Sequence, residues 1–313
     1  MVLTTWGRSS GFCVDPIEKK PLNHFYPGSA VLSFGTAGCN LACKFCQNWD
    51  ISKSKETDSL VDAATPETIA HAAVKLGCKS VAFTYNDPVV FAEYAMDIAD
   101  ACHELGVKTV AVTAGYIHAA PRVEFFRKMD AANVDLKGFT EDFYWRSCGG
   151  HLQPVLDTLE YLVKKTEVWT EITTLLIPGK NDSNAEIEAQ CRWIREHLGT
   201  EVPLHFTAFH PDWKMTDIVA TPRGTLQRAR DRARLAGLKY VYTGNVHDEA
   251  GGTTYCPACE EALVVRDWHQ INAYHLTETG ACGFCGAQLP GHWQKFGKPF
   301  GRRRLSVRLH PAS

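Results

Sequence analysis

Three cysteines near the N-terminal end of the chain are spaced closely enough to hold one metal cluster. Cys39, Cys43 and Cys46 form a CxxxCxxC pattern in the segment FGTAGCNLACKFCQNWDIS. Three thiolates do not close a structural zinc site, which normally takes four protein ligands. A [4Fe–4S] cluster has four irons that each take an outside ligand, so three cysteines leave one iron open for another molecule. The spacing indicates an iron–sulfur centre that does chemistry; the alternatives are a zinc site completed by a distant histidine and unrelated core cysteines.

A second group of four cysteines lies near the other end. Cys256 and Cys259 in CPAC are separated by 22 residues from Cys282 and Cys285 in CGFC. Each CxxC presents two thiolates to one metal, and four thiolates make a closed, structural site. The pattern predicts a zinc ribbon; a rubredoxin-like iron or an auxiliary iron–sulfur cluster remains the alternative. So short a segment is expected to fold largely around its metal.

Length and composition limit the classes of protein that these sites belong to. The chain has 313 residues, 45% of them hydrophobic and 22% charged, which is typical of a globular protein of about two domains. Its 33 basic and 35 acidic residues give a net charge of −2, which argues against a protein built to hold nucleic acid. Neither a secretory signal nor a run of about 18 apolar residues is present, so we expect a cytoplasmic protein without membrane contact. Reduced thiols in that compartment favour metal ligation over disulfides.

Short apolar runs alternate with amphipathic runs between residues 30 and 243. The expected strands are 30–35, 80–84, 108–113, 133–137, 168–177, 203–209 and 239–243. Thr65–Pro66, Thr221–Pro222 and the pair Ser183 and Glu186 are expected to start helices. This alternation predicts an α/β fold with a parallel sheet in an open or closed barrel, whose chemistry lies at the carboxyl ends of the strands.

The composition changes after about residue 250, and this suggests domain boundaries. We expect an N-terminal segment (1–29), a barrel (30–248), a zinc-ribbon-like module (249–293) and a tail (294–313). The tail is basic, and we expect it to be a solvated end, with binding of an anionic partner as the alternative.

The first cysteine motif, with the aromatic Phe45 before its last cysteine, resembles the hallmark of the radical S-adenosylmethionine (SAM) enzymes. DPIEKKPLNHF, TYNDP, VDLKGF and LIPGKND resemble the AmmeMemoRadiSam subgroup, which is related to pyruvate formate-lyase (glycyl-radical) activating enzymes. The resemblance covers residues 15 to about 293. It implies a partial (β/α)6 barrel and a [4Fe–4S] cluster whose open iron binds SAM. One electron then cleaves SAM to a 5′-deoxyadenosyl radical, which abstracts hydrogen from a substrate.

The resemblance also assigns residues that follow the expected strands. Asn86 and Asp87 match the motif that holds the SAM amino group, although the subgroup usually has Glu where this chain has Asp87. Asp135 is placed toward the ribose and Lys137 toward the methionine carboxylate, the alternative being a surface ion pair of Lys137 with Asp142 or Glu141. His205 matches a histidine near the ribose, the alternative being a core histidine.

Two weaker candidates also lie at strand ends. His210 could face the substrate, and Gly115 could allow close approach of the cofactor. Both have an ordinary structural alternative, as a surface histidine and a turn glycine.

The function implied is that of a radical SAM oxidoreductase similar to the activating enzymes. Its substrate is either a glycine of a partner protein or a small molecule. A flavodoxin-type or ferredoxin-type electron donor and Memo- or AMMECR-type proteins are the implied partners. The alternative from another class is a non-enzymatic scaffold in which both metal centres are structural.

Overall fold

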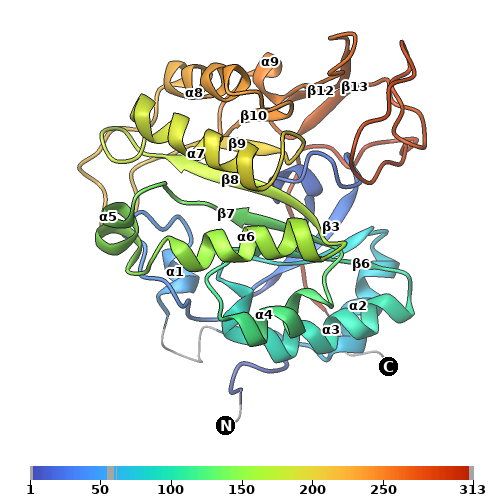
Figure 1. Cartoon of the computed structure of the whole chain (residues 1–313). Coiled ribbons are helices and arrows are strands. Elements are labelled where there is room, and N and C mark those ends of the chain that lie inside the picture. The colour runs from blue at the N-terminus through green and yellow to red at the C-terminus, as the bar shows by residue number, and fades with distance from the viewer. Residues whose placement is uncertain (1–2, 55–59, 61, 310–313) are drawn as a thin grey trace.

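A nine-stranded sheet forms the centre of the molecule (Figure 1). A computed structural model describes residues 3–54, 60 and 62–309. Seven neighbouring strands are parallel: β3 (Ala30–Phe34), β5 (Ser80–Phe83), β6 (Lys108–Thr113), β7 (Ala131–Asp135), β8 (Trp169–Leu176), β9 (Leu204–Ala208) and β10 (Val241–Gly244). All seven strands expected from the sequence are present. The sheet ends at β10 and does not return to β3, which confirms an α/β fold with an open barrel.

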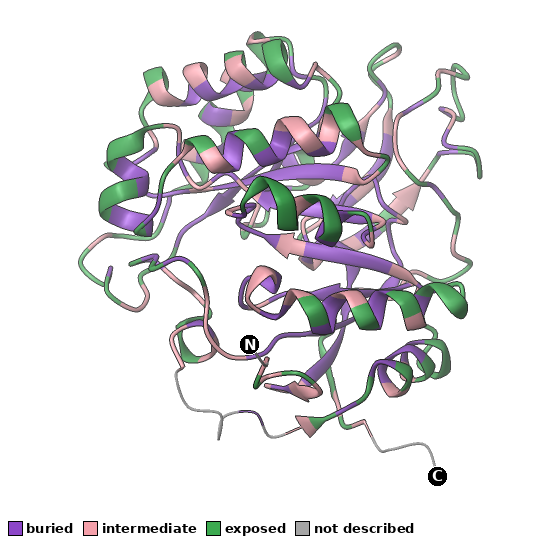
Figure 2. Cartoon of the chain, turned by 60° about the horizontal axis from the view of Figure 1, so that its bottom comes forward, coloured by how far each residue is buried: buried purple, intermediate pink, exposed green. Residues whose placement is uncertain are grey.

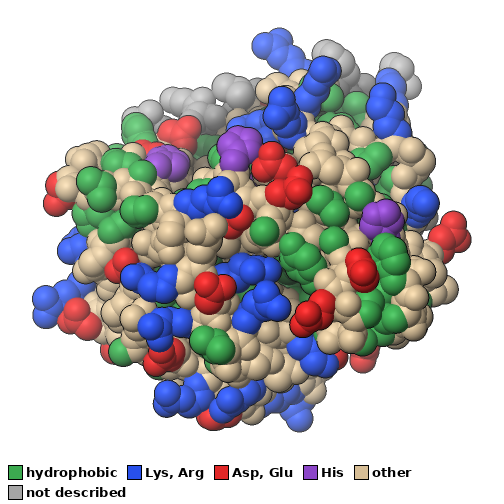
Figure 3. Space-filling view, turned by 90° about the horizontal axis from the view of Figure 1, so that it is seen from above, with side chains coloured by type: hydrophobic (Ala, Val, Ile, Leu, Met, Phe, Trp, Pro, Cys, Tyr) green, Lys and Arg blue, Asp and Glu red, His purple; other side chains and the backbone are tan. Residues whose placement is uncertain are grey.

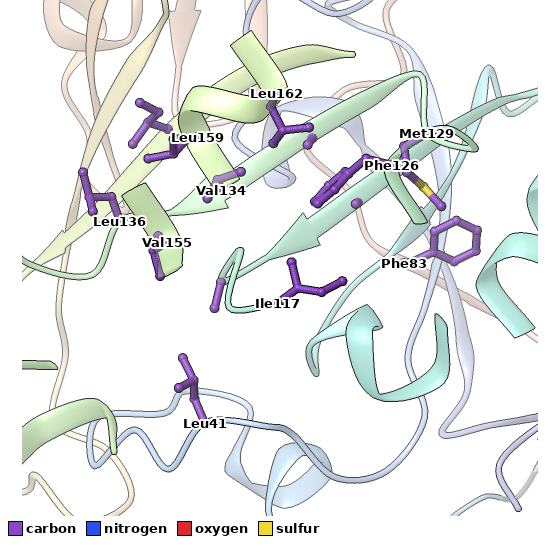
Figure 4. Packing of buried hydrophobic residues seen from close by; sticks show 14 of the residues in the cluster. Leu41, Phe83, Ile117, Phe126, Met129, Val134, Leu136, Val155, Leu159 and Leu162 are labelled. Carbon is purple, nitrogen blue, oxygen red and sulfur yellow. The ribbon is translucent and has the colours of Figure 1, made fainter. Parts of the chain in front are cut away.

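Helices between successive parallel strands cover the outer face of the sheet (Figure 1). They are α2 (Pro66–Lys75), α3 (Ala92–Glu104), α4 (Ala119–Phe126), α6 (Gln153–Lys165), α7 (Asn184–His197) and α8 (Arg223–Leu235). Each is buried on the side facing the strands and exposed on the other (Figure 2). Figure 4 shows Val155, Leu159 and Leu162 of α6 close to Val134 of β7. This packing fixes the strand ends from which the site is built.

Two of the three expected helix starts are capped as predicted. Thr65 Oγ1 accepts from Thr68 N at 3.3 Å at the start of α2. Ser183 Oγ accepts from Glu186 N at 3.2 Å at the start of α7. In a full capping box, the Glu186 side chain would also accept from the backbone N–H of Ser183. Here Glu186 Oε1 accepts from Phe139 N at 2.7 Å instead.

The third expected helix begins one residue later than predicted, and its expected cap is wrong. Helix α8 begins at Arg223, and its N-cap, Pro222, offers no side-chain bond. Thr221 Oγ1 instead donates to Leu176 O at 2.6 Å and accepts from Phe209 N at 3.0 Å. The hydroxyl is buried between the ends of β8 and β9, where these two backbone groups need partners more than an exposed helix end does.

The chain ends extend the sheet in a way that the sequence did not indicate. Strand β2 (Phe12–Pro16) pairs antiparallel with β3, and β14 (Leu305–Val307) pairs antiparallel with β2. The tail was expected to be a solvated end, and Leu305 and Ser306 of β14 are exposed, but the strand is also paired, because the open edge of β2 offers unpaired backbone groups. Residues 1–2 of the expected N-terminal segment and 310–313 of the expected tail lie outside the described residues.

A three-stranded antiparallel ribbon follows the barrel. It consists of β11 (Thr254–Tyr255), β12 (Ala262–Asp267) and β13 (Gln270–Tyr274). It has its own hydrophobic cluster, in which Leu263, Val264 and Trp293 pack with Tyr240 and Tyr242 of the barrel. The ribbon is therefore attached to the barrel through the last parallel strand.

The surface near α8 mixes charges of both signs (Figure 3). Ion pairs join Arg223 to Asp248 and Arg228 to Asp182, and Arg232 also pairs with Glu188. The basic residues of this helix are thus largely compensated. In the described part of the chain, no helix is both long and apolar enough to cross a membrane.

Candidate functional site

A cavity of about 460 Å³ lies at the carboxyl ends of the parallel strands. This volume is in the range of about 300–1,000 Å³ that is usual for small-ligand sites. The structure brings one group of predicted residues together in its wall: Cys39, Cys43, Phe45, Cys46, Asn86, Asp87, Asp135, Lys137 and His205. These residues come from four separate stretches of sequence, so the parallel topology brings them together at the carboxyl ends of the strands, as predicted.

The loop after β3 carries the three cysteines and is held in place by Asn86. Asn86 Oδ1 accepts from Thr36 N at 3.0 Å, and its Nδ2 donates to Gly38 O at 2.8 Å. Gly38 has a φ of +87°, which favours glycine at this turn. Asn86 therefore fixes the entry to the cysteine loop.

A fourth cysteine, Cys148, lies against this loop. Cys148 O accepts from Ala42 N at 2.8 Å, and Ser147 O accepts from Lys44 N at 2.9 Å. A thiol hydrogen bond from Cys148, which outweighs burial, lowers the pKa of Cys43 to about 7. Cys148 could not be found from the sequence, because more than a hundred residues separate it from the motif and no spacing signal connects them.

Two tryptophans close the outer side of the cysteine loop. Trp49 lies in α1 (Trp49–Ser52), and its ring stacks on Trp213 with centroids 5.0 Å apart. Lys214 N donates to Lys44 O at 3.0 Å. The loop after β9 thus contacts the cysteine loop directly.

The side chain of Phe45 points into the protein. It is buried, and its ring lies 5.8 Å from that of Phe143 in α5 (Glu141–Phe143). Phe45 therefore anchors the last turn of the motif between Cys43 and Cys46.

Asp87 accepts hydrogen bonds from the end of β6 and from its own turn after β5. Its carboxylate accepts from Thr113 Oγ1 at 2.9 Å and from Ala114 N at 2.8 Å. It also accepts from Val89 N at the start of the 3-10 turn η3 (Pro88–Phe91). Burial raises the pKa of Asp87 despite these bonds. Asp87 thus caps the turn that begins at Pro88 and ties the end of β5 to that of β6.

Asp135 and Lys137 pair with each other at the end of β7. Lys137 Nζ lies 2.9 Å from Asp135 Oδ2. The alternative partners, Glu141 and Asp142, pair instead with His151 and Arg146. Burial lowers the pKa of Lys137, but Asp135 and the thiols outweigh it and hold that pKa well above its usual value. The ammonium group therefore stays charged beside the cysteine loop.

His205 belongs to a buried polar network below the cavity. Its Nε2 lies 2.7 Å from Glu171 Oε2. The Glu171 carboxylate also accepts from Asn23 N, His24 N and Trp169 Nε1, at 2.9, 2.8 and 3.0 Å. Burial raises the pKa of Glu171, but these donors outweigh it and the pKa is lowered. Glu171 lies inside β8 and was not singled out from the sequence, where a single acidic residue in a strand gives no signal.

Replacing Glu171 by alanine is expected to cost about 3–5 kcal/mol of unfolding free energy, because His205 and two backbone N–H groups lose their acceptor. Denaturant unfolding measures this, with Glu171→Gln as the matched control that keeps one acceptor oxygen. Because the pKa of Glu171 is lowered in the folded protein, its contribution to stability depends on pH. The stabilisation is present above the unfolded pKa and is lost as the pH falls below about 4.5. Equal stability of the alanine variant and the wild type at pH 7 would contradict this role.

His210 and Gly115 are not part of the cavity wall. His210 is exposed, with Nδ1 3.9 Å from Asp212 Oδ2. A Cβ on Gly115 would lie 3.0 Å from Val134 Cγ1 and 3.4 Å from Thr158 Cγ2. The glycine thus permits close packing of α6 against β7, which agrees with its structural alternative as a turn glycine.

The second cysteine group forms a compact centre in the ribbon. Sulfur atoms of Cys256 and Cys285 are 3.6 Å apart, and those of Cys259 and Cys282 are 3.7 Å apart. Tetrahedral coordination with metal–sulfur bonds of about 2.3 Å places sulfurs about 3.8 Å apart. Phe284 N and Cys285 N each donate to Cys282 Sγ at 3.4 Å. Burial raises the pKa of Cys282, but these donors outweigh it and lower the pKa to about 7. The donor set fits one tetrahedral zinc or iron ion.

Comparison with known proteins decides the family. Residues 34–190 match the radical SAM superfamily. The chain belongs to the radical SAM superfamily. It is also 40% identical over 285 residues to an uncharacterized protein of Methanocaldococcus jannaschii, covering 91% of this chain and 84% of the relative.

More distant relatives agree with this assignment. The chain is 24% identical over 202 residues to the pyruvate formate-lyase-activating enzyme of Clostridium pasteurianum, covering 58% of this chain and 81% of the relative. A radical SAM methyltransferase from Sphaerobacter thermophilus is similar in structure, with a TM-score of 0.55 at 17% identity, covering 71% of this chain and 68% of the other. This likeness shows the fold.

The cysteine loop of this radical SAM protein fits the cluster that the family implies. Three thiols line the cavity. Within the described ranges, the four ribbon cysteines are the only group of three or more ligands whose donor atoms all lie within 4.8 Å of one another. The three loop sulfurs are therefore spread more widely than a single ion requires, as expected for ligands of a multi-iron cluster.

Gly35 keeps the cysteine loop next to the end of β5, and Gly35→Ala tests this contact. A Cβ there would lie 2.4 Å from Thr84 O and 2.6 Å from Asn86 Oδ1. We expect the substitution to cost about 1–3 kcal/mol of unfolding free energy and to reduce iron loading. Gly224→Ala is the matched control, because nothing lies within 4 Å of its added Cβ. Unchanged iron content and stability in the Gly35 variant would show that the loop tolerates the displacement.

Proposed function

We propose that this protein is a radical SAM oxidoreductase that removes a hydrogen atom from a substrate held in the cavity. The observation that carries the proposal is the convergence of Cys39, Cys43 and Cys46 on one cavity at the carboxyl ends of the parallel strands. A [4Fe–4S] cluster, when bound and reduced, supplies the electron that cleaves SAM to a 5′-deoxyadenosyl radical. The three cysteines are proposed to hold that cluster.

The residues around the loop have proposed roles that follow from their contacts. Asn86 fixes the loop through Thr36 and Gly38. Lys137 presents a charged ammonium group suited to the carboxylate of SAM, and Asp135 orients it from 2.9 Å. Asp87, Phe45 and His205 are proposed to complete the SAM site, with Asp87 and His205 acting through Thr113 and Glu171, which they contact.

The finer assignment rests on similarity and on the motifs of the sequence. Similarity to a pyruvate formate-lyase-activating enzyme supports an activating-enzyme-like reaction. We place the chain in the AmmeMemoRadiSam subgroup, with a flavodoxin-type or ferredoxin-type reductant and Memo- or AMMECR-type partners in the cytoplasm. The proposed substrate is either a small molecule or a glycine of a partner protein.

The proposed assignment of the second centre and of the domains completes this picture. We assign zinc to Cys256, Cys259, Cys282 and Cys285, whose sulfur spacing suits a single ion. The proposed division is 1–29, 30–248, 249–293 and 294–313, in which the last unit contributes β14 to the sheet.

The direct test is formation of 5′-deoxyadenosine. The protein is reconstituted anaerobically with iron and sulfide and then given dithionite and SAM. We expect 5′-deoxyadenosine and methionine to accumulate together. A fully loaded cluster that yields neither product would favour the structural-scaffold alternative.

A further inference from the structure

The cavity continues beyond the cysteine loop to a wall that the ribbon supplies. Arg266 of β12, and Trp268 and His269 in the turn before β13, line it. Arg266 Nη2 donates to Asn23 O at 2.8 Å, and the Tyr242 hydroxyl lies 2.9 Å from Thr254 Oγ1. These buried bonds fix the ribbon to the N-terminal segment and to β10. The ribbon is therefore part of the cavity, in addition to holding a metal centre.

Positive charge exceeds negative charge at this end. Lys20 Nζ lies 2.9 Å from Asp15 Oδ2, and Lys19 Nζ lies 3.7 Å from Asp15 Oδ1, so two ammonium groups share one carboxylate. Arg304 joins them, with its guanidinium 5.2 Å from the centroid of the Tyr85 ring, above which Lys20 also lies at 5.0 Å.

Arg304 is the cation of this group that lacks a carboxylate. Its Nε donates to Cys13 Sγ at 3.1 Å, and within the described residues it makes no ion pair shorter than 4.0 Å. Burial, followed by the charges of Lys19 and Lys20, lowers the pKa of His269 to about 4. With Arg266 and its partner Glu18 included, four cations and two carboxylates line this end of the cavity, so the arrangement gains from an added anion.

The floor of the same cavity holds polar atoms without partners. Thr173 Oγ1 and Glu18 Oε2 are buried and make no hydrogen bond within the described residues. Both residues line the cavity. Buried polar groups are nearly always satisfied, so these two atoms indicate a polar ligand in addition to the anion.

We propose that the substrate carries a carboxylate or a phosphate, which Lys19 and Arg304 bind at the end of the cavity walled by Trp268. The inference rests on the proposed function, because it names the substrate class of that site. The backbone of Trp268 has a φ of +57°, and its ring lies 4.9 Å from the His247 ring, measured between centroids. The turn before β13 and this ring contact therefore hold Trp268 in the cavity wall. The subsite lies on the side chains of the N-terminal segment, the ribbon and the tail, which together close the open edge of the barrel.

Equilibrium binding of two simple anions tests the subsite. Inorganic phosphate and succinate are titrated separately into the metal-loaded full chain by calorimetry, in a buffer that contains neither. We expect at least one to bind with one-to-one stoichiometry, and its identity distinguishes a phosphate from a carboxylate substrate. Binding by neither anion overturns the proposal.

Matched variants assign the binding to these residues. Arg304→Gln and Lys19→Gln are each expected to weaken it by about tenfold or more, whereas the neighbouring Arg303→Gln leaves it unchanged. Equal binding by all three variants and the wild type overturns the proposal, and so does displacement of the anion by SAM, which would assign these cations to the cofactor. Because no turnover is involved, the outcome is separate from the 5′-deoxyadenosine test of the proposed function.

Discussion

Replacing Cys43 by alanine is expected to abolish 5′-deoxyadenosine formation and to remove most of the iron and sulfide from the cysteine loop. Cys43 is the central thiol of the motif, and its pKa of about 7 favours the thiolate that a metal requires. A cluster with only two remaining protein ligands in the loop is poorly held. The expected loss of activity is therefore to background, several orders of magnitude, and not a graded reduction.

The matched control for this experiment is Cys191→Ala. Cys191 is also fully buried but lies in α7, away from the cavity wall. We expect it to keep its iron and its activity, with a modest loss of stability from the small space left in the core. Iron and sulfide content, together with product analysis, measure both variants. If the Cys43 variant bound as much iron as the control and still formed 5′-deoxyadenosine, the assignment of the loop would be wrong.

The barrel and the cysteine loop were predictable because their signals are local. A strand buried on both faces, such as β6, must be apolar over its whole length, and this is visible in a short window. The parallel topology then places residues that follow different strands at one end. Asn86 and Lys137, which are far apart in sequence, therefore meet at the cavity.

The rest of the site was not predictable because it depends on contacts between distant segments. Pairing of β14 with β2 joins residues almost three hundred positions apart, and such contacts leave no periodic signal. Lys20 and Asp15 are both buried and form an ion pair. A charged side chain is rarely buried without a partner, so neither residue alone would be expected in the interior. Glu171 is similar: a carboxylate inside a strand is stable here only because four donors from three segments surround it. The cavity wall from the ribbon was missed for the same reason.

Replacing Cys282 by alanine is expected to unfold the ribbon and to remove one metal ion from each chain. The ribbon has a small hydrophobic cluster, and the sulfur–sulfur distances of 3.6 and 3.7 Å show that its two knuckles meet at the four thiols. Structural zinc contributes about 10–16 kcal/mol of apparent binding energy in small zinc-dependent peptides, so loss of one ligand should cost several kcal/mol here. Metal analysis and hydrogen exchange of residues 254–293 measure the effect.

Cys78→Ala is the matched control for the ribbon, because Cys78 is buried near the barrel and away from the four thiols. It should keep the metal and the exchange protection of the ribbon. Unfolding of the ribbon should also remove Trp268 and His269 from the cavity, whereas the cysteine loop, held by Asn86 and the strand ends, should keep its iron. We therefore expect the two metal centres to respond independently to this substitution. The Cys282 variant should lose anion binding but keep the iron of the cysteine loop. Simultaneous loss of both centres would show instead that the ribbon supports the barrel itself, and full retention of the ribbon metal would contradict its coordination by Cys282.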